Sequence, residues 1–341
     1  MYKAKLSEPF WDCEKGDVLV LERQNAGQLL VMQKPDFCDH VPDYKASGDA
    51  GTLIVRPGGM GDIVHLGPAI KQVAIRDGRK PDVCVATRYV DCALYNPDVG
   101  NVVPYPLHWE DMEKYSQIHW LEDTVEGEKK LHMADAFLKG CGFDPDGLTE
   151  KEKRPMFFLD PDATPRVKRR RNRQRVGFQL KASAKCRTPT AKVFAPLINH
   201  YAQSGWEVYI FGAPGEIQLD DKMVKNTTQW EPTMSIMDSA VQMTTCDLFI
   251  APDSGLLHVA GALGIPSVGL YGPFPAELRT KYTPRCIAVE GKAFCSPCFW
   301  HSRGRHFPVG CPTEKTGACG VLDAIDPQVV IEAGERVMRS R

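Results

Sequence analysis

The chain has 341 residues, a formal net charge of −1 and a pI near 6.8, so no overall positive field draws it to nucleic acid or to an anionic membrane. Charged residues make up 25% and hydrophobic residues 43% of the chain, which is typical of a globular protein, and the length favours two domains. Because the sequence contains neither a signal-peptide core nor a run of transmembrane length, its 12 cysteines indicate a cytoplasmic protein with reduced thiols or metal ligands rather than disulfides.

Residues 1–48 are predicted to form a small β module followed by a linker. Two short apolar runs, 17–22 and 28–32, flank the sequence Gln-Asn-Ala-Gly, a pattern that favours a β-hairpin with a slightly long loop. Residues 35–48 are predicted to be the linker. Nothing in this module carries recognisable chemistry, so we expect it to serve packing or assembly.

The first larger domain, residues 49–168, opens with a β-α-β unit. A strand is predicted over 52–56, a helix over 63–76 and a strand over 82–86. The loop between the first strand and the helix can turn its amides towards an anion, and it contains Gly58, Gly59, Gly61 and Asp62. The glycine spacing differs from the dinucleotide fingerprint, and the Gly-Lys-Ser/Thr of a P-loop is absent, so both of those sites are disfavoured.

A basic run precedes the second domain. Seven basic residues lie between positions 166 and 175. Such a run is typical of a solvated linker, and contact with nucleic-acid phosphates is the alternative.

The second domain, residues 169–341, repeats the β-α pattern. Strands are predicted over 175–180, 206–211, 246–250 and 267–271, and the helices between them over 192–203, 235–245 and 256–263. This order predicts an α/β protein of two Rossmann-like parallel-sheet domains facing one another across a cleft. A last helix, 326–338, is expected to pack across the domains.

The stretch after the strand at 246–250 carries the strongest functional pattern. Asp253, Ser254 and Gly255 form a tight turn that opens a helix, and His258 lies one turn along that helix. The carboxyl end of a parallel strand is where α/β sheets bind ligands, and a helix N-terminus favours a phosphate. The alternative is that Asp253 only caps the helix and His258 is a packed residue.

Taken in order, these motifs resemble glycosyltransferase family 9, the ADP-heptose:lipopolysaccharide heptosyltransferases, which have the GT-B fold. The resemblance covers roughly residues 50–335, and its last block is the most specific. The matching pieces are Ile54-Val-Arg56 through Gly61-Asp62, Val176-Gly-Phe through Lys181-Ala-Ser183, Lys192, Glu216, Asp253-Ser254-Gly255 with His258, and Leu270-Tyr-Gly-Pro273.

The resemblance implies an inverting transfer of a sugar from a nucleotide-diphosphate donor, an ADP-sugar, to an acceptor hydroxyl, with no metal needed for the chemistry. Asp62 would be the general base, and its alternative role is a helix cap. Glu216 would face the nucleoside. The residues that would bind the donor are Lys181, Ser183, Lys192, Glu216, Asp253, Ser254, Gly255 and His258, with Gly58, Gly59 and Gly61 forming the loop on the acceptor side.

Two departures from the family pattern leave the acceptor open. The tryptophan-proline that follows the phosphate lysine in the family is Phe194-Ala195 here, and the first domain looks short. The acceptor is therefore a glycan, a lipid glycan or a modified base in DNA. A non-catalytic nucleotide-sugar binding or assembly protein and a GT-B nucleotide-sugar epimerase are the alternatives to a transferase.

A cysteine-rich segment spans residues 286–320. Its Cys-x2-Cys pair and two later thiols indicate a structural zinc or iron site formed by Cys295, Cys298, Cys311 and Cys319. His301 or His306 could replace one thiol, and four unliganded thiols are the alternative. The remaining cysteines, Cys13 among them, are predicted to be ordinary small apolar residues.

Overall fold

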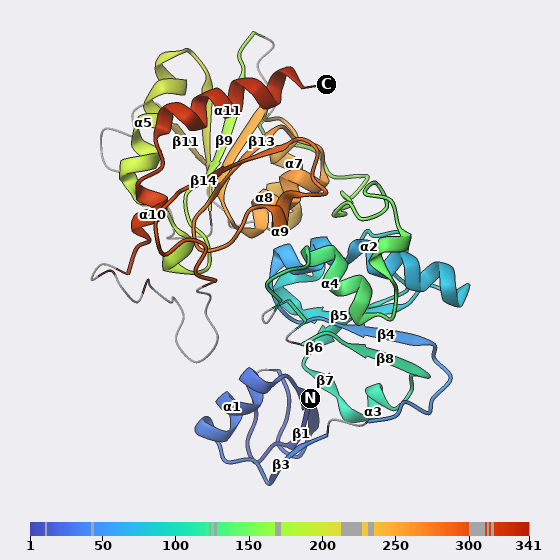
Figure 1. Ribbon diagram of the computed structural model, residues 1–341. Coiled ribbons are helices and arrows are strands. Elements are labelled where there is room, and N and C mark those ends of the chain that lie inside the picture. Colours follow the sequence, from blue (N-terminus) through green and yellow to red (C-terminus); the bar gives the residue numbers. More distant parts are fainter. Residues whose placement is uncertain are drawn as a thin grey trace.

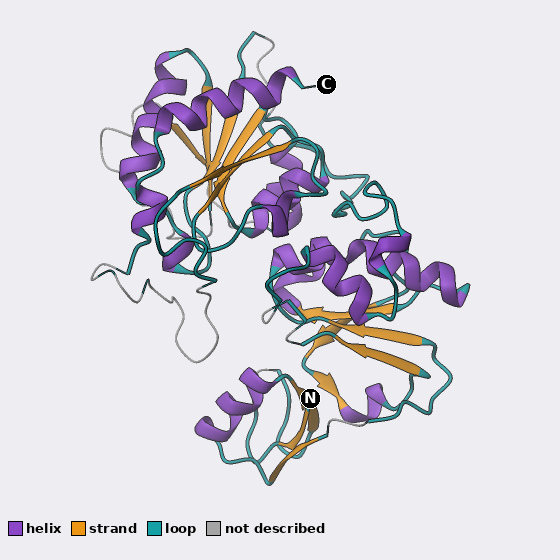
Figure 2. Ribbon diagram, viewed as in Figure 1, coloured by secondary structure: helices purple, strands orange, loops and turns teal. Residues whose placement is uncertain are grey.

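The protein consists of two α/β lobes and a small N-terminal module, as the computed structural model shows (Figure 1). Helices cover both faces of the sheet in the second lobe and one face of the sheet in the first lobe (Figure 2). The structure describes residues 1–10, 12–41, 44–122, 124–125, 128–167, 172–212, 227–230, 235–299, 311, 314 and 317–340.

The N-terminal module is a four-stranded antiparallel sheet that borrows one strand from the first lobe. The strand order is β3-β1-β2-β7. The borrowed strand, β7, pairs with β2 although about 85 residues separate them in the chain. The four strands are β1 (Tyr2–Lys5), β2 (Val18–Leu21), β3 (Phe37–His40) and β7 (Leu107–His108).

Two predictions for this module are wrong. The run at 28–32 belongs to helix α1 (Arg23–Met32), so the predicted hairpin does not form. The run looked like a strand because four apolar residues follow one another, but in the helix only Leu29 of 29–32 is buried, with Ala26 one turn before it. The predicted linker at 35–48 contains β3, which pairs with β1.

The first lobe is a four-stranded parallel sheet with the order β6-β5-β4-β8. Its strands and helices agree with the β-α-β prediction, with α2 beginning three residues earlier than expected. The elements are β4 (Thr52–Val55), α2 (Met60–Asp77), β5 (Asp82–Ala86), η1 (Thr87–Cys92), β6 (Val102–Tyr105), α3 (Trp109–Met112), β8 (Gln117–Trp120), α4 (Met133–Gly140) and η2 (Pro145–Gly147).

The N-terminal module covers one face of this sheet. Along β4, Ile54 packs with α2 and α4, whereas Leu53 and Val55 pack with the buried residues of the module. Alternate residues of a strand point to opposite faces, so β4 is buried on both. The module thus supplies a layer that helices supply in a doubly wound domain, which accounts for the shortness of residues 49–168.

The second lobe is a six-stranded parallel sheet with the order β11-β10-β9-β12-β13-β14. This is the 3-2-1-4-5-6 order of a Rossmann domain, in which the strand order reverses between β9 and β12. The elements are β9 (Arg175–Gln179), η3 (Lys185–Arg187), α5 (Ala191–Gln203), β10 (Glu207–Phe211), β11 (Thr227–Trp230), α7 (Ile236–Met243), β12 (Leu248–Pro252), α8 (Gly255–Ala262), β13 (Ser267–Tyr271), α9 (Glu277–Thr280), β14 (Cys286–Glu290), α10 (Gly320–Asp323) and α11 (Pro327–Arg339).

The last helix, α11, packs on this second sheet. Its neighbours are α5, β12, β13 and β14, and Figure 1 shows it lying across that lobe. The expectation that it would pack across both domains is therefore wrong. Its buried residues, which include Val330 and Val337, face the sheet because they recur at helical spacing.

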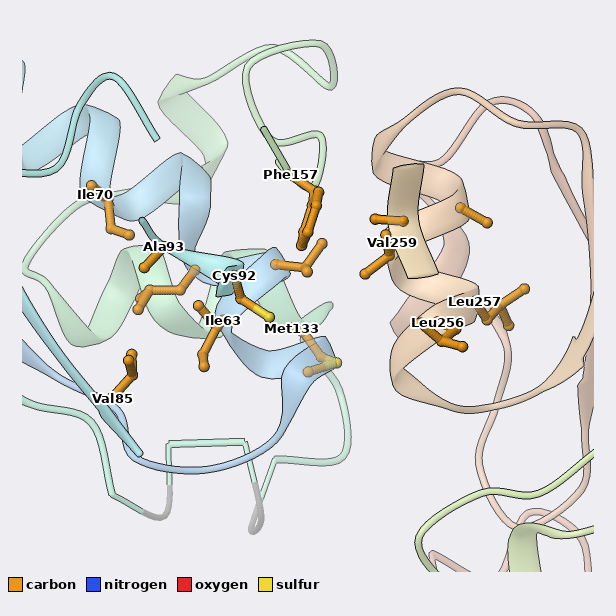
Figure 3. Close-up of a cluster of buried hydrophobic side chains, with 14 of the residues drawn as sticks. Ile63, Ile70, Val85, Cys92, Ala93, Met133, Phe157, Leu256, Leu257 and Val259 are labelled. Atoms are coloured by element: carbon orange, nitrogen blue, oxygen red, sulfur yellow. The ribbon is translucent and has the colours of Figure 1, made fainter. Parts of the chain in front are cut away.

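The two lobes meet along α2 and α8. One continuous apolar cluster runs from the core of the first lobe to α7 and α8 of the second. Figure 3 shows Leu256 and Val259 of α8 across from Met133 and Phe157 of the first lobe. Among the described helices, none is both long enough and apolar enough to cross a bilayer.

Candidate functional site

The loop between β4 and α2 presents Asp62 on the first turn of the helix. Gly59 has a φ of +34°, a backbone conformation that favours glycine, and it is the N-cap residue. Asp62 lies in the first turn of α2, and its Oδ2 accepts a hydrogen bond from Arg56 Nη2 at 2.7 Å. The general-base role and the helix-capping role of Asp62 both stay predictions.

The buried side chain of Arg56 fixes the position of the Asp62 carboxylate. This arginine follows β4 and its side chain is only 3% exposed, whereas that of Asp62 is 20% exposed. Its Nη1 donates to the Leu121 carbonyl at 2.9 Å, just after β8. Arg56 therefore spans the two strands where the order of the first sheet reverses, and it fixes the carboxylate at that point.

The matching loop of the second lobe carries Asp253. The strand β12 ends at Pro252, two residues later than predicted, and α8 begins at Gly255. Asp253 Oδ1 lies 3.3 Å from Nε2 of His258, and its Oδ2 lies 3.4 Å from Nη1 of Arg187. The N-cap of α8 is Ser254, with no side-chain cap bond, so Asp253 is not the cap of this helix.

Asp253 is a buried anion with several positive neighbours. Burial opposes its ionisation, but the hydrogen bond from His258 and the charges of Arg187 and Arg279 outweigh burial and hold the pKa of Asp253 well below its usual range. The side chain is 6% exposed. We conclude that it stays ionised at neutral pH and orders the groups around it.

Arg187 joins this loop to the one that follows β9. Its Nη2 donates to Ser183 Oγ at 2.7 Å, and its Nη1 donates to the Asp253 carbonyl at 3.2 Å. A second link is the hydrogen bond from Ser254 Oγ to Gln179 Oε1. Both links lie where the order of the second sheet reverses, which is the ligand end of such a sheet.

Among the predicted donor residues, Ser183 and Lys192 are exposed and Lys181 is half-buried. Lys192 lies in the first turn of α5, which Thr190 caps. Glu216 lies outside the described residues, as do Arg169–Arg171 of the basic run, so the structure says nothing about either.

The loops of the two lobes touch. A Cβ added to Gly61 would lie 2.5 Å from Cδ2 of His258, and one added to Gly255 would lie 2.7 Å from Cβ of Met60. Any side chain at either position would force the lobes apart. The predicted acceptor loop and the predicted phosphate loop are thus brought together.

Buried histidines cross the contact between the lobes. Nε2 of His65 on α2 lies 3.1 Å from Nδ1 of His258 on α8. His132 packs edge-on against His65 on one side and against Tyr282 of the second lobe on the other. Burial, together with neighbouring His258, His132 and Arg279, lowers the pKa of His65, and burial lowers the pKa of His132 to about 3. Both rings are therefore neutral at neutral pH.

Sequence reasoning missed two of these residues. Arg56 is quoted above only as part of a motif, and His65 is given no role. The spacing of Gly61, Asp62 and His65 on one helix could have indicated that they lie near a common surface. The partner of His65, His258, is 193 residues away, so no local pattern could identify it.

Three of the four predicted metal-binding thiols share one region. Burial raises the pKa of Cys319, and nearby Cys311 and Cys298 raise it further. Cys186 of η3 adjoins Cys319 and Cys298 as well. Within the described part of the chain, no three of these thiols come within 4.8 Å of one another. The donor set suits zinc or iron, and the metal site stays a prediction.

Comparison with known proteins yields one family model. The model described as "Glycosyltransferase family 9 (heptosyltransferase)" matches residues 129–304, more than half of the chain. A curated relative, lipopolysaccharide heptosyltransferase 2 of Escherichia coli K12, is 30% identical over 88 residues. That aligned segment covers 24% of this chain and only 25% of the relative.

Solved structures share the fold over nearly the whole chain. The ADP-heptose lipopolysaccharide heptosyltransferase II of E. coli has a TM-score of 0.63 at 15% identity, covering 84% of this chain and 98% of that chain. The iron-containing dodecameric glycosyltransferase TibC of enterotoxigenic E. coli has a TM-score of 0.65 at 14% identity, covering 99% and 91%. TibC has also been solved in complex with ADP-D-beta-D-heptose. At these identities the likeness establishes the GT-B fold.

Proposed function

Because the chain belongs to glycosyltransferase family 9, we propose that it transfers a sugar from a nucleotide-diphosphate donor to an acceptor hydroxyl, with inversion and without a catalytic metal. One observation carries this proposal. The loop bearing Asp62 and the loop bearing Asp253, Ser254 and Gly255 meet at the contact between the lobes, where Gly61 and His258 touch. Two substrates held by separate lobes can react only at such a junction.

The second lobe binds the donor diphosphate in this proposal. The first amides of α8 are free of a side-chain cap, and the positive end of the helix dipole favours an anion. Ser183 and Arg187 lie beside them, and Lys181 and Lys192 flank that loop. These groups stabilise the negative charge that the leaving nucleoside diphosphate gains, so the departure of the leaving group needs no metal ion.

Asp62 is the general base in this proposal. In a single displacement at the anomeric carbon, one carboxylate accepts the proton of the attacking hydroxyl while the bond to the leaving phosphate breaks. The Arg56 guanidinium keeps the Asp62 carboxylate oriented. The proton moves onto Asp62 only as the hydroxyl oxygen bonds to carbon and becomes strongly acidic.

The donor in this proposal is an ADP-sugar, and the acceptor is a saccharide. One structural relative is an ADP-heptose lipopolysaccharide heptosyltransferase, and TibC has been solved with ADP-D-beta-D-heptose. The curated relative is a lipopolysaccharide heptosyltransferase. We further propose that Cys295, Cys298, Cys311 and Cys319 hold a structural zinc or iron ion. The electrostatic effect of Cys298 and Cys311 on Cys319 supports this, as does the iron named for TibC. Its part would be to order the cysteine-rich segment.

A thermal-shift panel on the full-length protein tests the donor. ADP-sugars, UDP-sugars, GDP-sugars and the free diphosphates would each be added at equal concentration. We expect an ADP-sugar to stabilise the fold most, by about 2.7 kcal/mol at a concentration 100 times its dissociation constant. The double substitution of Ser183 and Lys192 by alanine should reduce that shift without lowering the unliganded melting temperature, because both side chains are exposed.

Turnover assays separate the competing functions. Release of ADP that requires a saccharide acceptor supports the transferase. A flat panel with every nucleotide sugar would contradict donor binding, and turnover of the donor into an epimer without any acceptor would establish an epimerase instead.

A further inference from the structure

A thiol, a carboxylate and an imidazole meet at one end of the N-terminal sheet, far along the chain from the cysteine-rich segment. Ligand atoms of Cys13, Asp17 and His108 all lie within 4.8 Å of one another. Sγ of Cys13 is 3.9 Å from Nε2 of His108. This is the one group of three metal-ligating side chains with that spacing among the residues that the structure describes.

The register of the sheet places His108 beside Asp17. His108 of β7 is directly opposite Leu19 of β2, so the two side chains share a face of the sheet. Asp17 precedes Leu19 by two residues, and residues two apart in an extended chain point the same way. Asp17 is therefore the diagonal neighbour of His108.

Backbone hydrogen bonds fix Cys13 against the other two. Phe10 and Cys13 bond to each other in both directions, which closes a tight turn. The Leu6 amide donates to the Asp17 carbonyl, and the Gly16 amide donates to the Leu6 carbonyl. Leu6 therefore lies beside Gly16 and Asp17, and Cys13 is 9% exposed.

The distance between Sγ of Cys13 and Nε2 of His108 is close to the one expected in a tetrahedral zinc site. Zinc binds cysteine sulfur at about 2.3 Å and histidine nitrogen at about 2.0–2.1 Å, which puts those two ligand atoms about 3.6 Å apart at a tetrahedral angle. The observed 3.9 Å exceeds this by a few tenths of an ångström.

We propose that Cys13, Asp17 and His108 bind a divalent cation of the zinc class, with water as the fourth ligand, and that this ion ties the N-terminal module to the first lobe. The mixed sulfur, nitrogen and oxygen donors suit zinc better than calcium or magnesium, which prefer oxygen alone. His108 lies on the borrowed strand β7, so the ion bridges residues of the module and of the lobe.

A bound zinc ion would attract both the thiolate of Cys13 and the carboxylate of Asp17, so binding would release the proton of the thiol.

Metal analysis of the full-length protein tests the site. The His108→Gln variant should contain one equivalent of zinc less than the wild type, and Asp17→Asn should bind zinc more than about 100-fold more weakly, since losing a ligand costs more than losing its outer-shell partner. The matched controls are Cys38→Ala and His40→Ala on β3 of the same sheet, which should leave the zinc content unchanged.

Cobalt distinguishes this site from the cysteine-rich one. In a Cys295→Ser/Cys298→Ser background, Co²⁺ should still give a thiolate-to-cobalt absorption band, and adding His108→Gln should remove it. In the same Cys295→Ser/Cys298→Ser background, a chelator should lower the melting temperature of the protein that keeps His108 but not that of the protein that also carries His108→Gln. If His108→Gln folds with the zinc content and the chelator response of the wild type, the assignment is wrong.

Discussion

The loop that opens α2 and the loop that opens α8 have the same architecture but opposite environments. Each follows a buried parallel strand, contains a close-packed glycine and carries an aspartate. Asp62 is 20% exposed and bonds to one arginine, whereas Asp253 is 6% exposed and lies between Arg187 and His258. The same β-α element therefore presents a carboxylate to the contact region in one lobe and buries one in the other.

The difference in exposure suits the two aspartates to different roles: Asp62 to proton transfer and Asp253 to holding its neighbours in place. A base must reach the substrate and must be able to accept a proton, so it needs partial exposure. A carboxylate whose pKa is held well below its usual range, as that of Asp253 is, takes no part in proton transfer near neutral pH. It serves instead to hold Arg187 and His258 in place. The same substitution in both loops should therefore have different effects.

The largest effect is expected from Asp62→Asn. Asparagine keeps an oxygen that can accept the hydrogen bond from Arg56, but it cannot take a proton. We expect kcat for sugar transfer to fall by about 10²–10⁴-fold, while the donor-induced thermal shift is kept. Asp77→Asn, at the other end of α2, is the matched control and should retain activity. Full activity in Asp62→Asn would remove this residue from the mechanism.

Asp253→Asn should act mainly on stability. The substitution leaves the guanidinium of Arg187 without its anionic partner in a buried place. We expect a loss of about 3–5 kcal/mol in the free energy of unfolding, measured by denaturant titration at pH 7. The wild type should lose this contribution as the pH falls below about 4, the pKa of the unfolded aspartate, whereas the variant should not. If Asp253→Asn is as stable as the wild type, the stabilising role assigned to Asp253 is wrong.

The smallest effect concerns the pH dependence of the contact between the lobes. His132 has a pKa of about 3 in the folded protein and about 6.5 when unfolded, so the unfolded state binds an extra proton between these values. Stability should therefore fall by about 1.4 kcal/mol per pH unit as the pH drops below 6.5, for this residue alone.

His132→Asn isolates that contribution. Asparagine is a good N-cap residue and can replace the bond that Nδ1 of His132 accepts from the Ala134 amide. The free energy of unfolding would be measured for both proteins at pH 6.5 and at pH 5. It should fall between these pH values less in His132→Asn than in the wild type, and the difference is the contribution of the one proton that His132 binds on unfolding. An unchanged drop would mean that the histidine is protonated in the folded state.

Much of the fold followed from local patterns. The strand at 82–86, the helix at 192–203 and the alternation of strand and helix were predictable, because periodic burial leaves a trace in the sequence. The Asp253-Ser254-Gly255 turn was found for the same reason. The helix at Arg23–Met32 was missed because its apolar run satisfies a strand pattern equally well, and only packing against the module decides between the two.

The sequence by itself determined which residues would lie at the carboxyl ends of the strands, since turn chemistry and the ends of apolar runs mark them. Only the tertiary structure decided which of these meet. The contact of His65 with His258 depends on the approach of the two lobes, and the position of His108 beside Cys13 and Asp17 depends on the register of β7 against β2. The residues in these contacts are not related by helical or strand periodicity, so the sequence pattern does not reveal them. They come together only when the elements pack.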